Sequence, residues 1–238
     1  MGSGKRRNIG TILLAILLFV LWSIVFQPYW ILRVITRLSP DVLYFVETGQ
    51  PTLALTIDDG PDSVTTPKIL DLLKLHQTYA TFFIITDRLR GNEEIVRRMV
   101  NEGHELANHL TTDEASILLK NAEFEQRLLA AHDALSRFSK VRWFRPGSGW
   151  YNRRMLSVLH KHGYRCVLGS VYPFDPQIPS SWFATRHVLR KARPGSVLVL
   201  HDHGSRGERT IEVLTKVLPE LKRRGLRVAT LSELVDRT

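Results

Sequence analysis

The chain has 238 residues, 44% of them hydrophobic, which is enough to bury the core of one large domain with an appendage. Its formal net charge is +10, but the excess is spread along stretches such as 221–227. No dense basic block with interleaved aromatic residues is present, so the sequence does not favour nucleic-acid binding. The single cysteine, Cys166, excludes an intramolecular disulfide and lies in an apolar run that predicts a core position.

The first feature in chain order is an apolar segment without a charged side chain from Asn8 to Leu32, preceded by three basic residues. About 20 residues of helix cross the hydrocarbon core of a membrane. The alternative is a cleavable signal peptide, but its apolar region is about 7–15 residues long and ends in a small-x-small site. We therefore predict that residues 1–41 form a tail, a transmembrane anchor and a linker. The domain that follows is expected outside the cytoplasm.

After Pro40, apolar runs that are typical of strands alternate with segments of helical periodicity. Strands are predicted at 52–57, 80–85, 105–107, 142–144, 164–171, 196–200 and 226–230. Helices are predicted at 67–77, 92–103, 121–138, 152–163, 182–192, 209–225 and 232–236. About seven such alternations indicate an α/β domain with a parallel sheet. Their number, and the lack of a glycine-rich phosphate loop, favour a distorted parallel (β/α) barrel over residues 42–238.

Titratable or cationic side chains follow five of the predicted strands. They are Asp58, Asp59, His109, Arg145, Asp175, His201 and Asp202. Each has a structural explanation when taken alone, because an Asp pair before Gly-Pro is usually a turn and a single histidine usually lies in a loop. In a parallel barrel, however, the carboxyl ends of the strands share one face, and that face carries catalysis. Their common placement therefore predicts an active site.

The chemistry of these side chains is that of metal-assisted hydrolysis. Aspartate and histidine are suitable ligands for a divalent ion with open positions. A further aspartate can accept a proton from water, and a histidine can donate one to a leaving group. An arginine can fix a neighbouring carboxylate. No serine or cysteine nucleophile stands out, because Ser148 does not lie in a GxSxG context.

Five short motifs carry a resemblance to a known family. They are TIDDGPD (56–62), NHLTTD (108–113), RPGSGWYN (145–152), DPQ (175–177) and VLVLHDH (197–203). Over residues 52–235 the sequence resembles the polysaccharide deacetylases, carbohydrate esterase family 4, which share the chitooligosaccharide deacetylase homology domain. The first and last motifs are specific. The second and fourth depart from the family pattern.

The resemblance implies a distorted (β/α) barrel that removes N-acetyl, or less often O-acetyl, groups from a polysaccharide. It implies that Asp58 is the general base and that Arg145 orients it. It implies that His201 is the general acid and that Asp175 tunes it. Asp59 and His109 would bind the metal. A main-chain N–H near Tyr151 would help to hold the oxyanion.

The second metal histidine of the family is replaced by Asp113, four residues after His109. A helical turn lets residues at this spacing meet, so we predict that Asp113 is the third metal ligand. Zinc is the expected ion, with manganese or cobalt as alternatives because a second carboxylate favours harder ions. The competing interpretation is that Asp113 only caps the segment that it begins.

Two further functions remain open at this point. The same barrel can hydrolyse a small amide or cyclic imide, or it can bind a glycan without catalysis if Asp113 marks a weakened metal site. The joint presence of Asp58, Asp59, Arg145 and His201 favours the enzyme. The expected partners are a polysaccharide substrate and a membrane. No protein partner and no nucleic acid is inferred.

Overall fold

The computed structural model describes residues 3–26 and 28–237. The chain divides into two compact units, Met1–Pro40 and Asp41–Thr238. We call them the N-terminal unit and the barrel unit, and each is described by itself.

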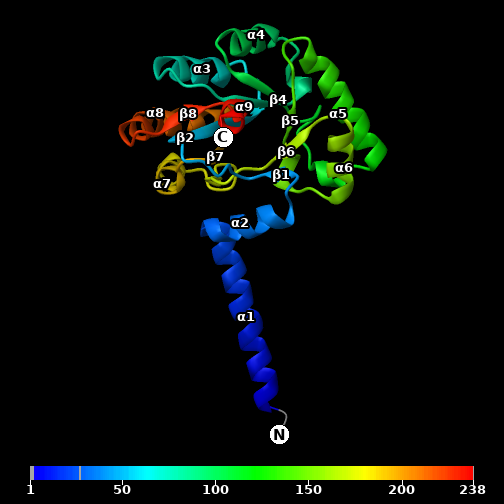
Figure 1. The fold of residues 1–238 in the computed structure, drawn as a ribbon, viewed down its shortest axis with the longest axis vertical. Helices are drawn as coiled ribbons and strands as arrows, with labels where there is room; N and C mark the ends of the chain where they lie inside the picture. Colours follow the sequence, from blue (N-terminus) through cyan, green and yellow to red (C-terminus); the bar gives the residue numbers. More distant parts are fainter. Residues whose placement is uncertain (1–2, 27, 238) are drawn as a thin grey trace. The chain divides into compact units, whose positions relative to one another are not determined.

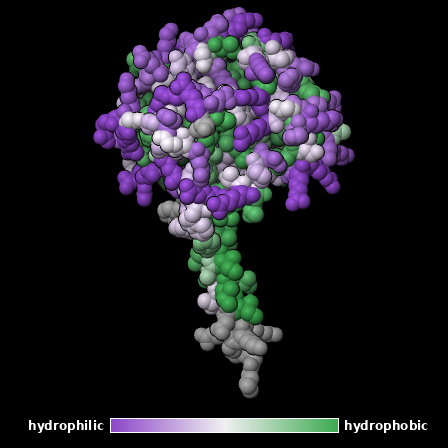
Figure 2. All heavy atoms as spheres, in the orientation of Figure 1, coloured by the Kyte–Doolittle hydropathy of each residue, from purple (hydrophilic) through white to green (hydrophobic). Residues whose placement is uncertain are grey.

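The N-terminal unit consists of two helices, α1 (Ser3–Phe26) and α2 (Tyr29–Leu38). Pro28 lies at the N-cap of α2 with φ −65° and ψ 134°. Proline has no amide hydrogen and fixes φ, so it is tolerated at a helix start but not in the middle of a helix. Most of the described side chains of α1 are hydrophobic (Figure 2).

Within the described ranges, no helix combines the length and the apolar composition that crossing a membrane requires. The transmembrane helix predicted within residues 8–32 is therefore wrong, and the membrane anchor, membrane partner and extracytoplasmic location that depend on it are not supported. The uncharged run on which the prediction is based is divided between two helices, because α1 ends at Phe26 and α2 begins at Tyr29 with Pro28 as its cap.

The barrel unit is built on one sheet in which every pair of strands is parallel. The strand order is β1-β6-β5-β4-β3-β2-β7, and β8 pairs with β2. The bounds are β1 (Val42–Leu43), β2 (Thr52–Gly60), β3 (Thr81–Ile84), β4 (Glu105–Asn108), β5 (Trp143–Phe144), β6 (Arg165–Val167), β7 (Val197–His201) and β8 (Arg227–Ala229).

The sheet curls until the chain beyond β6 meets β7. Val171 forms an isolated parallel bridge with Leu198, and Phe45 forms an antiparallel bridge with Ser196. The two bridges join the two sides of the sheet, and we call them together the seam. The predicted distorted parallel barrel is thereby confirmed, although a seam of single bridges takes the place of one continuous ladder.

Helices surround the strands on the outside (Figure 1). They are α3 (Thr65–Leu75), α4 (Glu93–Asn101), α5 (Asn121–Ser136), α6 (Arg153–Lys161), α7 (Ser181–Lys191) and α8 (Gly204–Arg223), with single 3₁₀ turns η1 (Thr86–Arg88), η2 (Ser116–Leu118) and η3 (Gly147–Gly149). The last helix, α9 (Leu231–Asp236), lies in the middle of this view, and its Leu231 and Leu234 pack in the core cluster of the barrel. Three of the helices begin at side-chain caps, where Asn152 accepts from the Met155 amide, Ser180 from the Phe183 amide and Thr230 from the Glu233 amide. Such caps satisfy amides that have no partner within the helix.

The core fills the barrel and the space under the helices. All nine residues of β2 are buried, as expected for a strand that is covered on both faces. Phe83, Trp143 and Val167 pack in one cluster that joins three other strands. Cys166 is 1% exposed, which confirms its predicted core position, and burial raises the pKa of its thiol to about 12. The thiol is therefore uncharged at neutral pH.

Candidate active site

The carboxyl ends of β2 and β7 bring two of the predicted residues together. The ladder between these strands places Asp58 directly opposite His201, and the Asp202 amide donates to the Asp58 carbonyl at 2.7 Å. The ladder with β3 shifts register between Asp58 and Gly60, and Asp59 has φ 70°. A positive φ is uncommon for aspartate and turns the chain sharply. The first and last motifs therefore meet at one end of the sheet.

A buried ion pair holds Asp58. The Arg145 Nη1 atom lies 2.5 Å from Asp58 Oδ1, and both side chains are about 5% exposed or less. The same guanidinium donates to Thr56 Oγ1 at 2.8 Å and to the Val167 carbonyl at 3.2 Å, and it lies over the Phe83 ring at 4.1 Å. These contacts fix the arginine from three strands. They leave Asp58 with one oriented carboxylate in a dry environment.

A second buried pair holds His201. Its Nδ1 donates to Asp175 Oδ2 at 2.8 Å, which leaves Nε2 as the nitrogen available for chemistry. Burial acts to lower the pKa of His201, but the charges of Asp175, Asp58 and Asp59 outweigh burial, so the pKa is raised. The Arg209 side chain donates to the Asp175 carbonyl at 3.1 Å and helps to position that loop.

The third pair consists of Asp59 and His109, whose Oδ1 and Nε2 atoms are 3.4 Å apart. His109 Nδ1 donates to the Arg145 carbonyl at 2.7 Å, which orients the ring. Burial acts to raise the pKa of Asp59, but the bond to His109 and the charges of His109, His201 and Arg206 hold it well below its usual range. Burial acts to lower the pKa of His109, but the bond to Asp59 and the charges of Asp58 and Asp59 outweigh burial, so the pKa is raised. The two directions agree on an ion pair.

Asp113 lies apart from this pair in the loop after β4. Its side chain is 46% exposed, and its carboxylate lies 3.1 Å from Arg88 Nη2 and 3.8 Å from Arg206 Nη2. Arg206 Nη1 in turn lies 2.6 Å from Asp59 Oδ2, and Arg88 donates to the Asp59 carbonyl. Two guanidinium groups therefore bridge the residues that the sequence predicts as metal ligands.

The donor set fits a divalent ion at two of the three predicted positions. His109 presents Nε2 beside Asp59 Oδ1, and its other nitrogen is anchored on a carbonyl, as is usual for a metal-ligating histidine. The Asp113 carboxylate faces arginine instead. In the part of the chain that the structure describes, no group of three His, Cys, Asp or Glu residues is placed to hold a metal. The ligand set of Asp59, His109 and Asp113 stays a prediction.

Sequence reasoning missed four residues that shape the site: Thr56, Arg88, Arg206 and Arg209. Arg206 and Arg209 lie three residues apart on α8, directly after the last motif, and therefore share one face of the helix. That spacing was the available signal for them. Thr56 and Arg88 gave no signal of their own, because their contacts come from other strands and loops.

Asp202, next to His201, has a structural role. It is fully buried and accepts a bond from Thr65 Oγ1 at 2.6 Å and a second from Thr66 Oγ1. Burial raises its pKa to about 6. A Cβ atom on Gly60 would lie 3.0 Å from Asp202 Oδ2, so the loop after β2 needs glycine to approach so closely. This contact fixes the loop that follows Asp59.

Comparison with known proteins gives consistent results. A family model described as polysaccharide deacetylase matches residues 45–167. A peptidoglycan-N-acetylglucosamine deacetylase of Bacillus cereus is 34% identical over 197 residues, which cover 82% of this chain and 92% of that protein. A chitooligosaccharide deacetylase of Sinorhizobium fredii is 33% identical over 199 residues, covering 78% of this chain and 93% of that protein.

The fold is also similar to a solved structure of the same kind. The crystal structure of a peptidoglycan N-acetylglucosamine deacetylase in complex with 4-naphthalen-1-yl-N-oxidanyl-benzamide matches with a TM-score of 0.79 and 30% sequence identity, covering 84% of this chain and 95% of that chain. Sequence and structure therefore agree over most of the barrel unit. The chain belongs to the polysaccharide deacetylase family, carbohydrate esterase family 4, and is a hydrolase of that family.

Proposed function

We propose that the chain removes N-acetyl groups from a polysaccharide that contains N-acetylglucosamine, with Asp58 as general base and His201 as general acid. The observation that carries the proposal is the pair of buried dyads, Asp58 with Arg145 and His201 with Asp175, on adjacent strands. The names of the relatives support the substrate class, because they act on peptidoglycan N-acetylglucosamine and on chitooligosaccharides.

Asp58 has the environment that a general base needs. Arg145 bonds to Oδ1 at 2.5 Å, which orients the carboxylate and leaves Oδ2 to accept a proton from the attacking water. Because the guanidinium is itself fixed by Thr56 and the Val167 carbonyl, the carboxylate cannot turn away. The water adds to the acetyl carbonyl carbon as Asp58 takes its proton.

His201 completes the reaction from the neighbouring strand. Asp175 holds Nδ1, so Nε2 points its proton away from the carboxylate and toward the bond that breaks. Donation of that proton to the amide nitrogen allows the carbon–nitrogen bond to cleave. The products are acetate and a free amine on the sugar.

Asp59 and His109 are the residues that would hold a divalent ion, which would polarise the acetyl carbonyl and lower the pKa of water when bound. One carboxylate oxygen and one imidazole nitrogen suit zinc, and participation of Asp113 would favour manganese or cobalt. For Asp113 to join them, its carboxylate has to leave Arg88 and Arg206.

The test is acetate release from N-acetylglucosamine oligomers and from peptidoglycan by the full chain, with zinc, manganese or cobalt added. Asp58→Asn is expected to lower kcat by about 10²–10⁴-fold. Asp71→Asn is the matched control, because Asp71 is an exposed aspartate whose partner is a surface arginine. Acetate release by the Asp58 variant at the parent rate would overturn the assignment.

The same assay separates the other candidate functions. Release from small amides or imides, with none from glycans, would indicate the small-substrate hydrolase. Glycan binding without acetate release under any metal condition would indicate a non-catalytic barrel.

A further inference from the structure

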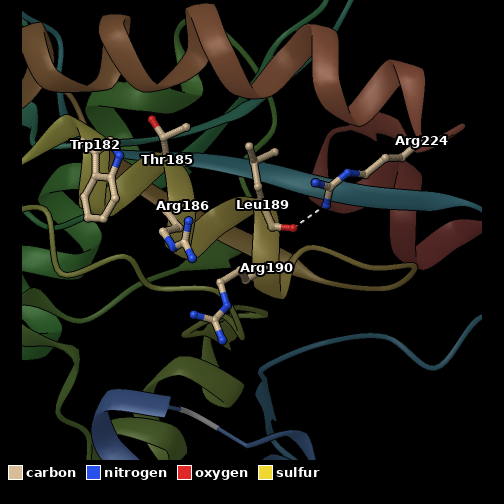
Figure 3. Close-up of a pocket in the computed structure, with 6 residues that line it drawn as sticks. All are labelled: Trp182, Thr185, Arg186, Leu189, Arg190 and Arg224. Atoms are coloured by element: carbon tan, nitrogen blue, oxygen red, sulfur yellow. Dashed lines mark hydrogen bonds between the residues drawn. The ribbon is translucent and has the colours of Figure 1, made fainter.

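A cavity of about 440 Å³ lies on the outer surface of the barrel unit, away from the site described above. It is formed by α7 and by the residue that follows α8. Figure 3 shows the side chains of α7 in a row, with the last arginine reaching back from the end of α8. The lining residues are Trp182, Thr185, Arg186, Leu189, Arg190 and Arg224. None of them belongs to the candidate active site.

An exposed indole lies at one end of this cavity. Trp182 is 67% exposed, although tryptophan is normally buried over most of its surface. Arg186 lies over its ring, with Cζ 5.7 Å from the ring centroid, and Leu189 adds apolar surface one turn further on. An open indole face next to a cation is suited to the apolar C–H face of a sugar ring that also carries negative charge.

The cavity has positive charge without a matching carboxylate. Arg186 and Arg190 are exposed one turn apart on α7, and neither forms an ion pair with any carboxylate in the described ranges. Arg224 differs, because its Nε bonds to Glu220 Oε1 at 2.7 Å and its Nη1 donates to the Leu189 carbonyl. Two guanidinium groups therefore remain for a ligand, and their planar geometry matches a carboxylate or a phosphate.

The surroundings are also cationic. Burial, together with the charges of Lys191 and Arg190, lowers the pKa of the neighbouring His187 to about 4. Like charges one helical turn apart repel, so an arrangement of this kind is stabilised when an anion binds between them.

We propose that this cavity binds an anionic segment of a polysaccharide, with a sugar ring stacked on Trp182 and its acidic group paired with Arg186 and Arg190. The cavity is widely open to solvent and has one aromatic platform, which suits one or two sugar rings. A nucleic acid would instead need an extended basic surface with several aromatic side chains. The inference is independent of the proposed function, because binding here requires none of the catalytic residues.

The experiment is titration calorimetry of the full chain with oligogalacturonate, a glycan with one carboxylate on each ring. Maltooligosaccharide of equal length, which carries neither charge nor acetyl groups, is the uncharged comparison, and inorganic polyphosphate is the charged comparison without rings. Oligogalacturonate is expected to bind most tightly, with an affinity that falls as salt is raised. A third comparison is a vesicle that contains anionic phospholipid, which is expected not to bind.

Variants locate the site. Trp182→Ala is expected to weaken oligogalacturonate binding about tenfold, and Trp182→Phe, which keeps a ring, less than that. Arg190→Gln is expected to weaken binding several-fold and to reduce its salt dependence. Arg154→Gln on α6 is the matched control, because Arg154 is also exposed and has no ion pair within the described part of the chain. Thermal unfolding of each variant shows that the fold is retained.

Four outcomes would overturn the inference: no binding of oligogalacturonate, equal binding of polyphosphate, equal binding of the uncharged oligomer, or a loss in Arg154→Gln as large as in Arg190→Gln. Binding to the vesicle alone would also contradict it and would indicate a lipid surface. None of these outcomes depends on acetate release, so a failure here is distinct from a failure of the proposed function.

Discussion

The two halves of the candidate site are held in different ways. The proposed base and acid, Asp58 and His201, come from strand ends that the β-ladder places side by side, and each side chain has one buried partner. The proposed metal half joins Asp59 and His109 to Asp113, which lies in an exposed loop and pairs with arginines. Geometry set by strand register is rigid, whereas geometry set by a loop leaves room for exchange of partners.

The largest effect is expected from a substitution in the proposed base and acid half of the site. Arg145→Met leaves the buried Asp58 carboxylate without its counter-charge, which typically costs about 3–5 kcal/mol of folding stability. Urea unfolding measures the free energy of unfolding. The double variant that also replaces Asp58 with Asn is expected to recover part of the loss, and a single variant as stable as the parent would show that the pair is not buried as described.

The next largest effect is expected at His201, the proposed general acid. Asp175→Asn is expected to lower kcat for acetate release by on the order of 10²-fold, because His201 Nδ1 loses its charged acceptor. The loss should be smaller for an acetyl ester of a good leaving group, which needs little protonation. Equal losses for amide and ester substrates would argue against His201 as the acid.

The third prediction concerns a histidine outside the site that contrasts with His109 and His201. His104 accepts a bond from the Ala80 amide, and no carboxylate of the described residues bonds to it, so burial lowers its pKa to about 4, from 6.5. Between these values the unfolded chain binds more protons, so the stabilising contribution is complete above pH 6.5 and decreases as pH falls toward 4. The loss is about 3 kcal/mol, at about 1.36 kcal/mol for each pKa unit.

Urea unfolding at a series of pH values measures that contribution as the difference between the parent and His104→Gln. The difference isolates His104 from His109 and His201, whose raised pKa values act in the opposite direction. A difference that does not change between pH 4 and 6.5 would contradict the prediction.

The smallest expected effect concerns the proposed metal half of the site. Arg206→Gln removes the guanidinium that bridges Asp59 and Asp113, so the affinity for zinc, manganese or cobalt is expected to rise several-fold. Calorimetric titration with the metal alone measures it, and Lys216→Gln on the same helix is the control. If Asp113 is a ligand, Asp113→Ala reverses the gain. If it is only a capping residue, metal affinity is unchanged and stability falls by about 1 kcal/mol.

The barrel and the strand-end residues were predictable because they depend on local patterns. Apolar runs and helical periodicity indicate the elements, and the parallel topology gathers the carboxyl ends at one face. The arginines around Asp59 and Asp113 were not predictable, because their contacts depend on how η1 and α8 pack above the strands. The two-residue strand β1 was missed because so short a strand has no period, and it exists only through its pairing with β6.

The transmembrane prediction failed for a different reason. It followed from the absence of charge between Asn8 and Leu32, whereas helix continuity depends on the backbone. The single residue Pro28 decides where the second helix begins. Composition over a long window therefore says less about such a segment than the position of one proline.

The seam of the barrel has a kinetic consequence. Few backbone bonds close it, among them those from the Val171 amide to the Val197 carbonyl and from the Val199 amide to the Val171 carbonyl. Asp175 lies on one side of the seam and His201 on the other, so local opening would separate the acid from the carboxylate that orients it. Amide hydrogens at the seam are expected to exchange with solvent sooner than those of β2. Each such opening would interrupt proton transfer until the seam closed again.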